Sequence, residues 1–208
     1  MKKLESSLLN MTLVLTGVAV IMGAVLAYVN DLTSGPINEQ KEKALADGIK
    51  AVMVSDDIVV AHTDTVKQND AKGKELTYII YKTKNAQGED LGAAVESTTG
   101  GFGGDLRVLV GFNPSGDILG YTLLEHAETP GLGAKADKWF QKGEKGDIIG
   151  KNPQEPLTVS KDGGQVDAIT ASTITSRAFL LAVNNAYTAY KATPTDGETG
   201  ATKQKEEE

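Results

Sequence analysis

The 208-residue sequence has no cysteine, two histidines (His62 and His126) and few aromatic residues, which make up 5% of the chain. Without cysteine there is no disulfide, no thiolate metal site and no iron–sulfur cluster held by thiolates. Two histidines are too few for a three-histidine catalytic zinc site, and no H-E-x-x-H sequence is present. The absence of cysteine does not indicate the cellular compartment, because a cysteine-free chain is stable in oxidising and reducing surroundings alike.

Basic residues are also in the minority, with 21 Lys and Arg against 28 Asp and Glu and a net charge of −7. This balance argues against binding to a nucleic-acid backbone, which needs clustered lysine and arginine. The length is sufficient for one domain of ordinary size with appendages.

A long uncharged run is present near the N-terminus, between Glu5 and Asp31. Its apolar part, 8–29, predicts a transmembrane helix in contact with lipid, because at about 1.5 Å per residue it spans roughly 33 Å. A cleaved signal peptide ending near Val25-Leu26-Ala27 is the alternative, although the apolar core of signal peptides is usually shorter.

Two basic residues, Lys2 and Lys3, lie close to one end of this run, whereas the nearest on the other side are Lys41 and Lys43. The positive-inside rule then predicts a cytoplasmic N-terminus, 1–7, and an extracytoplasmic position for the rest of the chain.

The remainder of the chain predicts an α+β domain. Ser34-Gly35-Pro36 is expected to end the membrane helix and start a linking amphipathic helix over 36–53. The domain follows over 54–191, and the aperiodic, charged segment 192–208 predicts a disordered acidic tail. Within the domain, strand patterns predict three successive hairpins and therefore an antiparallel sheet. The expected strands are 76–83, 91–97, 106–112, 117–126, 156–160 and 165–169, and the last helix is expected over 175–191.

Two conspicuous motifs have ordinary explanations. The run Gly100–Gly104 lacks the G-x-G-x-x-G spacing of a dinucleotide loop and no Walker lysine follows it, so a flexible loop between strands is favoured. Trp139 and Phe140 are expected to anchor the core rather than to stack on a ligand.

Chemistry is expected from two segments, Glu128–Gly133 after a strand and Asp167–Arg177 at the start of the last helix. Five of the seven residues from Thr170 to Ser176 have a hydroxyl group. Capping of the helix needs only one or two of them. The unpaired N–H groups and positive dipole end of a helix start bind phosphate, so a phosphate site at 172–177 is the alternative.

The second segment resembles the flavinylation motif of the FMN-binding domain family, Ser/Thr-Gly-Ala-Ser/Thr-x-Ser/Thr, here Thr170-Ala171-Ser172-Thr173-Ile174-Thr175. The resemblance implies a phosphodiester from FMN to Thr175, with Ser176 as the fallback acceptor. Ala171 replaces the motif's Gly and Ser172 replaces its Ala. If the motif needs a positive φ there, Ala171 costs about 1 kcal/mol.

Within that family the sequence is most similar to the G subunit of the Rnf ion-translocating electron-transport complex. The resemblance implies a single-pass protein of the bacterial inner membrane that relays electrons between ferredoxin and NAD with other membrane subunits. The C subunit of the sodium-translocating NADH:quinone reductase and a non-redox, membrane-tethered binding or assembly module are the alternatives.

The resemblance also implies a Mg-dependent flavin transferase that loads FMN from FAD. No histidine is local to Thr175 in the sequence, so the base that activates its hydroxyl is expected to belong to the transferase. The expected cofactor-binding residues are Glu128, Thr129, Gly131, Leu132, Gly133, Ser172, Thr173, Ile174 and Arg177.

Overall fold

The computed structural model describes residues 8–55, 57–69 and 75–192. The predicted cytoplasmic N-terminus, 1–7, and most of the predicted acidic tail, 193–208, lie outside the described residues. The chain divides into two compact units, 1–45 and 46–208, which are described separately.

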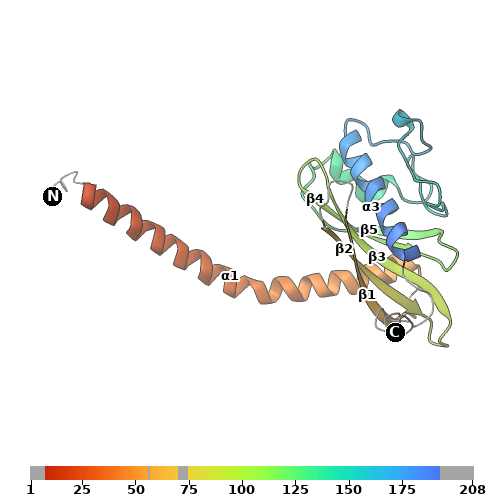
Figure 1. Cartoon of the computed structure of the whole chain (residues 1–208), viewed down its shortest axis with the longest axis horizontal. Coiled ribbons are helices and arrows are strands. Elements are labelled where there is room, and N and C mark those ends of the chain that lie inside the picture. The colour runs from red at the N-terminus through yellow and green to blue at the C-terminus, as the bar shows by residue number, and fades with distance from the viewer. Residues whose placement is uncertain (1–7, 56, 70–74, 193–208) are drawn as a thin grey trace, which may run out of the picture. The chain divides into compact units, whose positions relative to one another are not determined.

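Helix α1, Leu8–Met53, begins the described chain (Figure 1). It is long and apolar enough to cross a membrane. The helix break predicted at Ser34-Gly35-Pro36 is wrong, because Pro36 lies inside a continuous helix. Proline removes only the bond to the carbonyl four residues earlier, that of Leu32, so helical bonding on either side continues.

The second unit is built on a five-stranded antiparallel sheet with the order β1-β2-β3-β4-β5 (Figure 1). Consecutive strands are neighbours throughout, so the sheet is a simple meander, and the predicted α+β class is confirmed. The strands are β1 Val59–Asn69, β2 Glu75–Lys84, β3 Asp90–Gly100, β4 Asp105–Phe112 and β5 Ile118–His126.

Strand β1 was not predicted. It pairs with β2 along its whole length and forms an edge of the sheet. Because an edge strand contributes little to the core, its sequence is polar and lacks a clear apolar alternation. The available signal was its β-branched content, since Val59, Val60, Thr63, Thr65 and Val66 all favour strands.

The predicted third hairpin, 156–160 with 165–169, is wrong. Only an isolated bridge joins Val159 to Val166, and a short 3₁₀ helix, η2 Ser160–Asp162, occupies the expected turn. The bridge is parallel, with the backbone of Val166 bonded to Thr158 and Ser160, and beyond it the backbone of the second expected strand binds side chains. The carbonyl of Asp167 accepts from Trp139 Nε1, and the amide of Ile169 donates to Ser176 Oγ.

Helix α3, Thr173–Ala192, covers one face of the sheet and confirms the helix expected over 175–191 (Figure 1). Its apolar stripe is buried, and Phe179 stacks on Phe140 with ring centroids 4.3 Å apart. Phe140 is therefore the core anchor that its sequence predicted. The packing of this buried stripe against the core also positions the first turn of α3 relative to the sheet.

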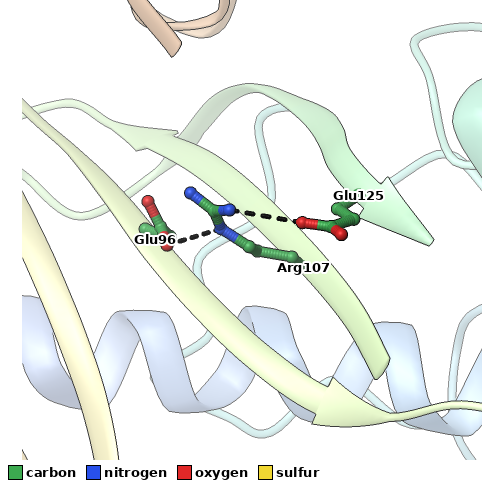
Figure 2. Close-up of polar contacts among 3 residues, drawn as sticks. All are labelled: Glu96, Arg107 and Glu125. Carbon is green, nitrogen blue, oxygen red and sulfur yellow. Dashed lines mark hydrogen bonds and ion pairs between the residues drawn. The ribbon is translucent and has the colours of Figure 1, made fainter. Parts of the chain in front are cut away.

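An ion network joins β3, β4 and β5 across the sheet (Figure 2). Arg107 Nε donates to Glu96 Oε1 at 2.7 Å, and its Nη1 donates to Glu125 Oε2 at 3.5 Å. The hydrogen bond to Glu96 raises the pKa of Arg107 above its ordinary value. These charges are paired with one another within the sheet.

Candidate functional site

The two chemically promising segments meet in the structure. Glu128 lies just after β5 and Thr175 lies in the first turn of α3, and Thr175 Oγ1 donates a hydrogen bond to Glu128 Oε2 at 2.8 Å. Both residues are buried, with Glu128 6% and Thr175 1% exposed. The pair joins residues 47 positions apart, and the sheet and α3 together decide its geometry.

This pair has the composition of an activated nucleophile. A hydroxyl is a weak nucleophile by itself, and a carboxylate that accepts its hydrogen bond can also accept its proton. The 2.8 Å separation of the two oxygens lies within the range over which such a proton moves directly. The sequence indicated each residue separately but gave no sign that they touch.

The glycine-rich turn between β3 and β4 is a third component of this site. Glu128 Oε1 accepts hydrogen bonds from the backbone amides of Phe102, at 2.7 Å, and Gly103, at 3.2 Å. The buried carboxylate therefore joins the turn to α3. The sequence suggested only a flexible loop here, because nothing in it indicated an acidic residue to which the amides donate.

Two glycines allow this close approach. A Cβ on Gly101 would lie 2.1 Å from Glu128 Oε1. A Cβ on Gly133 would lie 2.3 Å from Glu128 Oε2 and 2.8 Å from Thr175 Oγ1. Because a side chain at either position would displace the Glu128 carboxylate, these glycines are required for the carboxylate to lie where it does. Gly133 was predicted as a site residue, and its backbone does lie against this pair.

The turn before α3 has the conformation that the motif's glycine suggested. Ala171 has a φ of 61°, in the left-handed region, and Ser172 donates its amide to the carbonyl of Ile169 at 3.0 Å. An alanine in this conformation costs about 1 kcal/mol relative to its preferred backbone geometry. The turn places Ser172 just before the helix, where its carbonyl accepts the amide of Ser176.

Ser176, the fallback acceptor, has a structural role. Its side chain is fully buried, its Oγ donates to the carbonyl of Ser172 at 3.0 Å, and it accepts the amide of Ile169 at 2.9 Å. Both bonds hold the turn against the helix start. Its partners are backbone groups, which cannot take up the hydroxyl proton as a carboxylate can.

Thr173 occupies a different environment. It is the first residue of α3 and is partly exposed. Its Oγ1 accepts a hydrogen bond from Lys161 Nζ at 3.1 Å. The ammonium group and the helix dipole both favour an anion near this helix start. Lys161 was not expected at this site, because it lies 12 residues from Thr173 and in an element that was not predicted.

Arg177, expected to contact a phosphate, is paired with a carboxylate. Its Nε and Nη2 donate to the two oxygens of Asp162, both at 2.7 Å. The same bond lowers the pKa of Asp162 below its ordinary value. The structure thus places Arg177 on a protein carboxylate, and Lys161 is the cation beside Thr173.

The loop after Glu128 forms a tight turn, and exposed apolar side chains lie on this loop and on the first turn of α3. Thr129 accepts the amides of Leu132 and Ala134 through its carbonyl, and Gly131 has a φ of 79°. Leu132 is 41% and Ile174 is 54% exposed. An open hollow of about 390 Å³ lies along this loop. It is lined by Pro130, Gly131, Ala134, Lys135, Asp137, Lys138, Trp139 and Glu144.

Trp139 ends the short helix α2, Ala136–Trp139, and has one side on the hollow and another against the core. Its Nε1 donates to the carbonyl of Asp167 at 2.8 Å, which ties α2 to the segment that leads into α3. The predicted core role is thus correct for Phe140 and partly correct for Trp139, which remains accessible from the hollow.

Comparison with known proteins connects this site to a family. Residues 101–188 match the FMN-binding domain, a range that extends from the glycine-rich turn into α3. The G subunit of an ion-translocating oxidoreductase complex from Shewanella piezotolerans is 31% identical, covering 86% of this chain and 88% of its own length. The G subunit from Vibrio cholerae is 33% identical over 84% of this chain and 86% of its own. That of Photorhabdus laumondii is 35% identical over 79% and 81%. The chain therefore belongs to the family of G subunits of ion-translocating oxidoreductase complexes, with an FMN-binding domain behind a single membrane helix.

Proposed function

We propose that this chain is the membrane-anchored electron-transfer subunit of an Rnf-type complex and holds FMN by a phosphodiester to Thr175. The observation that carries the proposed attachment is the hydrogen bond from Thr175 Oγ1 to Glu128 Oε2. It gives the last hydroxyl of the motif a carboxylate partner. FMN would supply one-electron redox chemistry, while the protein fixes its position and potential.

The surroundings of Thr175 fit a flavin phosphate. It lies in the first turn of α3, where unpaired amides and the helix dipole favour an anion. Lys161 adds a positive charge at the same helix start, where its Nζ contacts Thr173, two residues before Thr175. Exposed Leu132 and Ile174 provide apolar surface for the flavin ring.

The burial of Thr175 requires a movement during attachment. The hydroxyl is covered by Glu128 and by the backbone at Gly133, which belong to one loop, 128–133. The part of this loop beyond Glu128, including Gly133, has to move away from the helix start to admit the donor, while the amides of Phe102 and Gly103 keep Glu128 in place. Beyond Glu128 it has exposed residues, including Leu132, on which a transferase can act.

Thr173 is the second candidate acceptor. It is partly exposed and its hydroxyl lies beside Lys161, so a phosphate could reach it without movement of the loop. Its partner is a cation, however, and an ammonium group does not accept the proton that the hydroxyl must lose. The motif resemblance and the carboxylate partner both favour Thr175.

A separate flavin transferase, using FAD and Mg²⁺, is the proposed partner in maturation. Lys2 and Lys3 beside the apolar run favour a cytoplasmic N-terminus, which would place the flavin domain outside the cytoplasm. A covalent bond suits that location, because a tethered cofactor keeps a high local concentration where free FMN is dilute.

The electron-transfer role is proposed together with other membrane subunits. The relatives reported above are all named as the G subunit of an ion-translocating oxidoreductase complex. The match to a G subunit favours a ferredoxin:NAD complex of the Rnf type over the quinone reductase, whose related subunit is C. The FMN-binding domain likewise favours a redox subunit over a binding or assembly module.

The test is intact mass and flavin fluorescence of the denatured full chain, purified from cells that contain the transferase. We expect a mass increase of one FMN less one water, and fluorescence on the denatured band. Fragment-ion sequencing of the tryptic peptide 162–177 then locates the modified hydroxyl. An unmodified wild-type chain would contradict the proposed function.

Valine variants identify the acceptor. Thr175→Val should abolish labelling, whereas Thr173→Val should keep it. Thr188→Val, an exposed threonine further along α3, is the matched control and should label normally. Modification mapped to Thr173 would retain the cofactor but overturn the choice of Thr175.

A further inference from the structure

We propose that Glu128 accepts the hydroxyl proton of Thr175 during flavin attachment, so that the chain supplies the base for its own modification. The inference rests on the proposed function and gives one residue outside the motif a chemical task. Its basis is the buried contact between Thr175 Oγ1 and Glu128 Oε2, at 2.8 Å.

The carboxylate is held in place independently of the threonine. Its other oxygen, Oε1, accepts the amides of Phe102 and Gly103 in the glycine-rich turn. Gly101 and Gly133 leave no room for a Cβ beside the carboxylate oxygens. Oε2 is thus directed at Thr175 by the fold and remains available to take a proton.

The chemical step balances without any redox change. The Thr175 Oγ1–P bond forms at the FMN phosphorus of FAD, and the P–O bond of the pyrophosphate breaks. AMP leaves with the bridging oxygen, and the hydroxyl proton passes to Glu128 Oε2. One proton therefore moves from Thr175 to Glu128 while the phosphorus of FMN moves from the bridging oxygen of AMP to Thr175 Oγ1.

Proton transfer to Glu128 also removes an electrostatic conflict in the product. A phosphodiester on Thr175 carries one negative charge, and a second charge on the neighbouring carboxylate would be unfavourable in a buried site. Once Glu128 holds the proton it is neutral, and its O–H can donate to a phosphate oxygen. The same proton thus serves the reaction first and the attached phosphate afterwards.

The experiment measures FMN transfer to the unmodified full chain, made in cells without transferase and supplied in detergent with FAD, Mg²⁺ and the enzyme. Glu128→Gln keeps an oxygen for the two amides but cannot accept the proton. Its kcat of transfer should fall roughly a hundredfold or more, the range for a lost general base. Glu125→Gln, at an exposed glutamate three residues earlier on β5, is the control and should match the wild type.

The pH dependence of this defect separates proton transfer from a structural effect. A general base acts only in its ionised form, so the wild-type rate should approach that of Glu128→Gln as the pH is lowered. Taking the ratio of the two rates cancels the transferase's own pH dependence. His126 is the ionisable side chain next to this segment, its Nδ1 accepting the Glu128 amide at 3.3 Å. His126→Asn in both backgrounds should leave the trend in the ratio unchanged.

Several outcomes would overturn the inference while leaving the proposed function in place. Equal kcat for Glu128→Gln and the wild type would do so, and so would a defect of the same size at every pH. A ratio whose trend disappears with His126→Asn would assign the pH dependence to the histidine instead. If the wild-type chain takes up no FMN at all, the proposed function itself fails.

Discussion

The first turn of α3 presents two threonines, two residues apart, in opposite surroundings. On its inner side Thr175 is buried and hydrogen-bonded to Glu128, which also binds the backbone of the glycine-rich turn. On its outer side Thr173 is partly exposed and faces Lys161. The same residue type thus meets a carboxylate on one side and an ammonium group on the other.

This difference teaches that exposure and chemical activation are separate properties of a hydroxyl. The outer threonine is the easier to reach, but its partner cannot take a proton. The inner threonine has the partner that a nucleophile needs, but the loop 128–133 covers it. If this division is correct, inner substitutions should reduce both stability and flavin attachment, and outer ones should affect neither strongly.

The largest effect on stability is expected for Glu128→Ala. It leaves the buried Thr175 hydroxyl and the part-buried amide contacts of Phe102 and Gly103 without their acceptor, which should cost about 3 kcal/mol of unfolding free energy. Chemical denaturation of the full chain in detergent, followed by fluorescence of its single tryptophan, measures this. Glu128→Gln keeps an acceptor oxygen and should lose less, and an unchanged midpoint for the alanine variant would contradict the structural role.

Thr175→Val and Thr173→Val should separate the two sides directly. The first removes the donor to a buried carboxylate and should cost about 1.5–3 kcal/mol, whereas the second is a surface change and should stay within about 0.5 kcal/mol. The same denaturation measurement applies, on unmodified chains, with Thr175→Ser as the control that keeps the hydroxyl. Equal losses of unfolding free energy in the two valine variants would contradict the difference between the inner and outer sides.

Ala171→Gly should stabilise the turn that leads into both threonines. The left-handed φ of 61° is strained for alanine and free for glycine. The relief of strain, partly offset by the greater freedom of glycine in the unfolded chain, should give a gain of about 0.5 kcal/mol. A higher unfolding midpoint with unchanged FMN content is the expected result, and a lower midpoint would show that the turn does not have this conformation.

The smallest effect is expected from Arg177→Met on the outer side. Loss of the guanidinium should let the pKa of Asp162 rise toward its ordinary 3.8, which NMR titration of that carboxyl can follow. A carboxyl with a lowered folded pKa stabilises the protein above its unfolded pKa and loses that contribution as the pH falls. The small stability difference from the wild type should therefore be present at neutral pH and shrink below about pH 4. A pKa of Asp162 that does not move would show that the ion pair does not form.

Much of the fold followed from local patterns in the sequence. The strands over β2–β5 and the helix α3 have clear apolar periodicity, because each buries one side against the same core. The prediction failed where side chains bind the backbone, as at Asp167 and Ile169, and where an edge strand buries little, as in β1. It also failed at Pro36, because one missing hydrogen bond does not end a helix whose other turns stay bonded.

The candidate site was predictable only in parts. The hydroxyl-rich helix start was identified because it has more hydroxyl groups than a cap needs, and the segment 128–133 because it directly follows a predicted strand. Arg177 was expected on a phosphate, but both of its bonded nitrogens donate to a carboxylate, that of Asp162. The base was expected from another protein, because a search for a histidine near Thr175 in the sequence does not detect a distant glutamate.

By itself, the sequence determined that the chain has a membrane-length apolar helix, an antiparallel sheet with a helix packed on it, and a hydroxyl-rich helix start at 170–176. The tertiary structure decided which charges meet those hydroxyls. Glu128 lies 47 residues from Thr175, and Lys161 lies 12 from Thr173. Contacts at such separations depend on how the sheet, η2 and α3 pack, and no local pattern of residues encodes that packing.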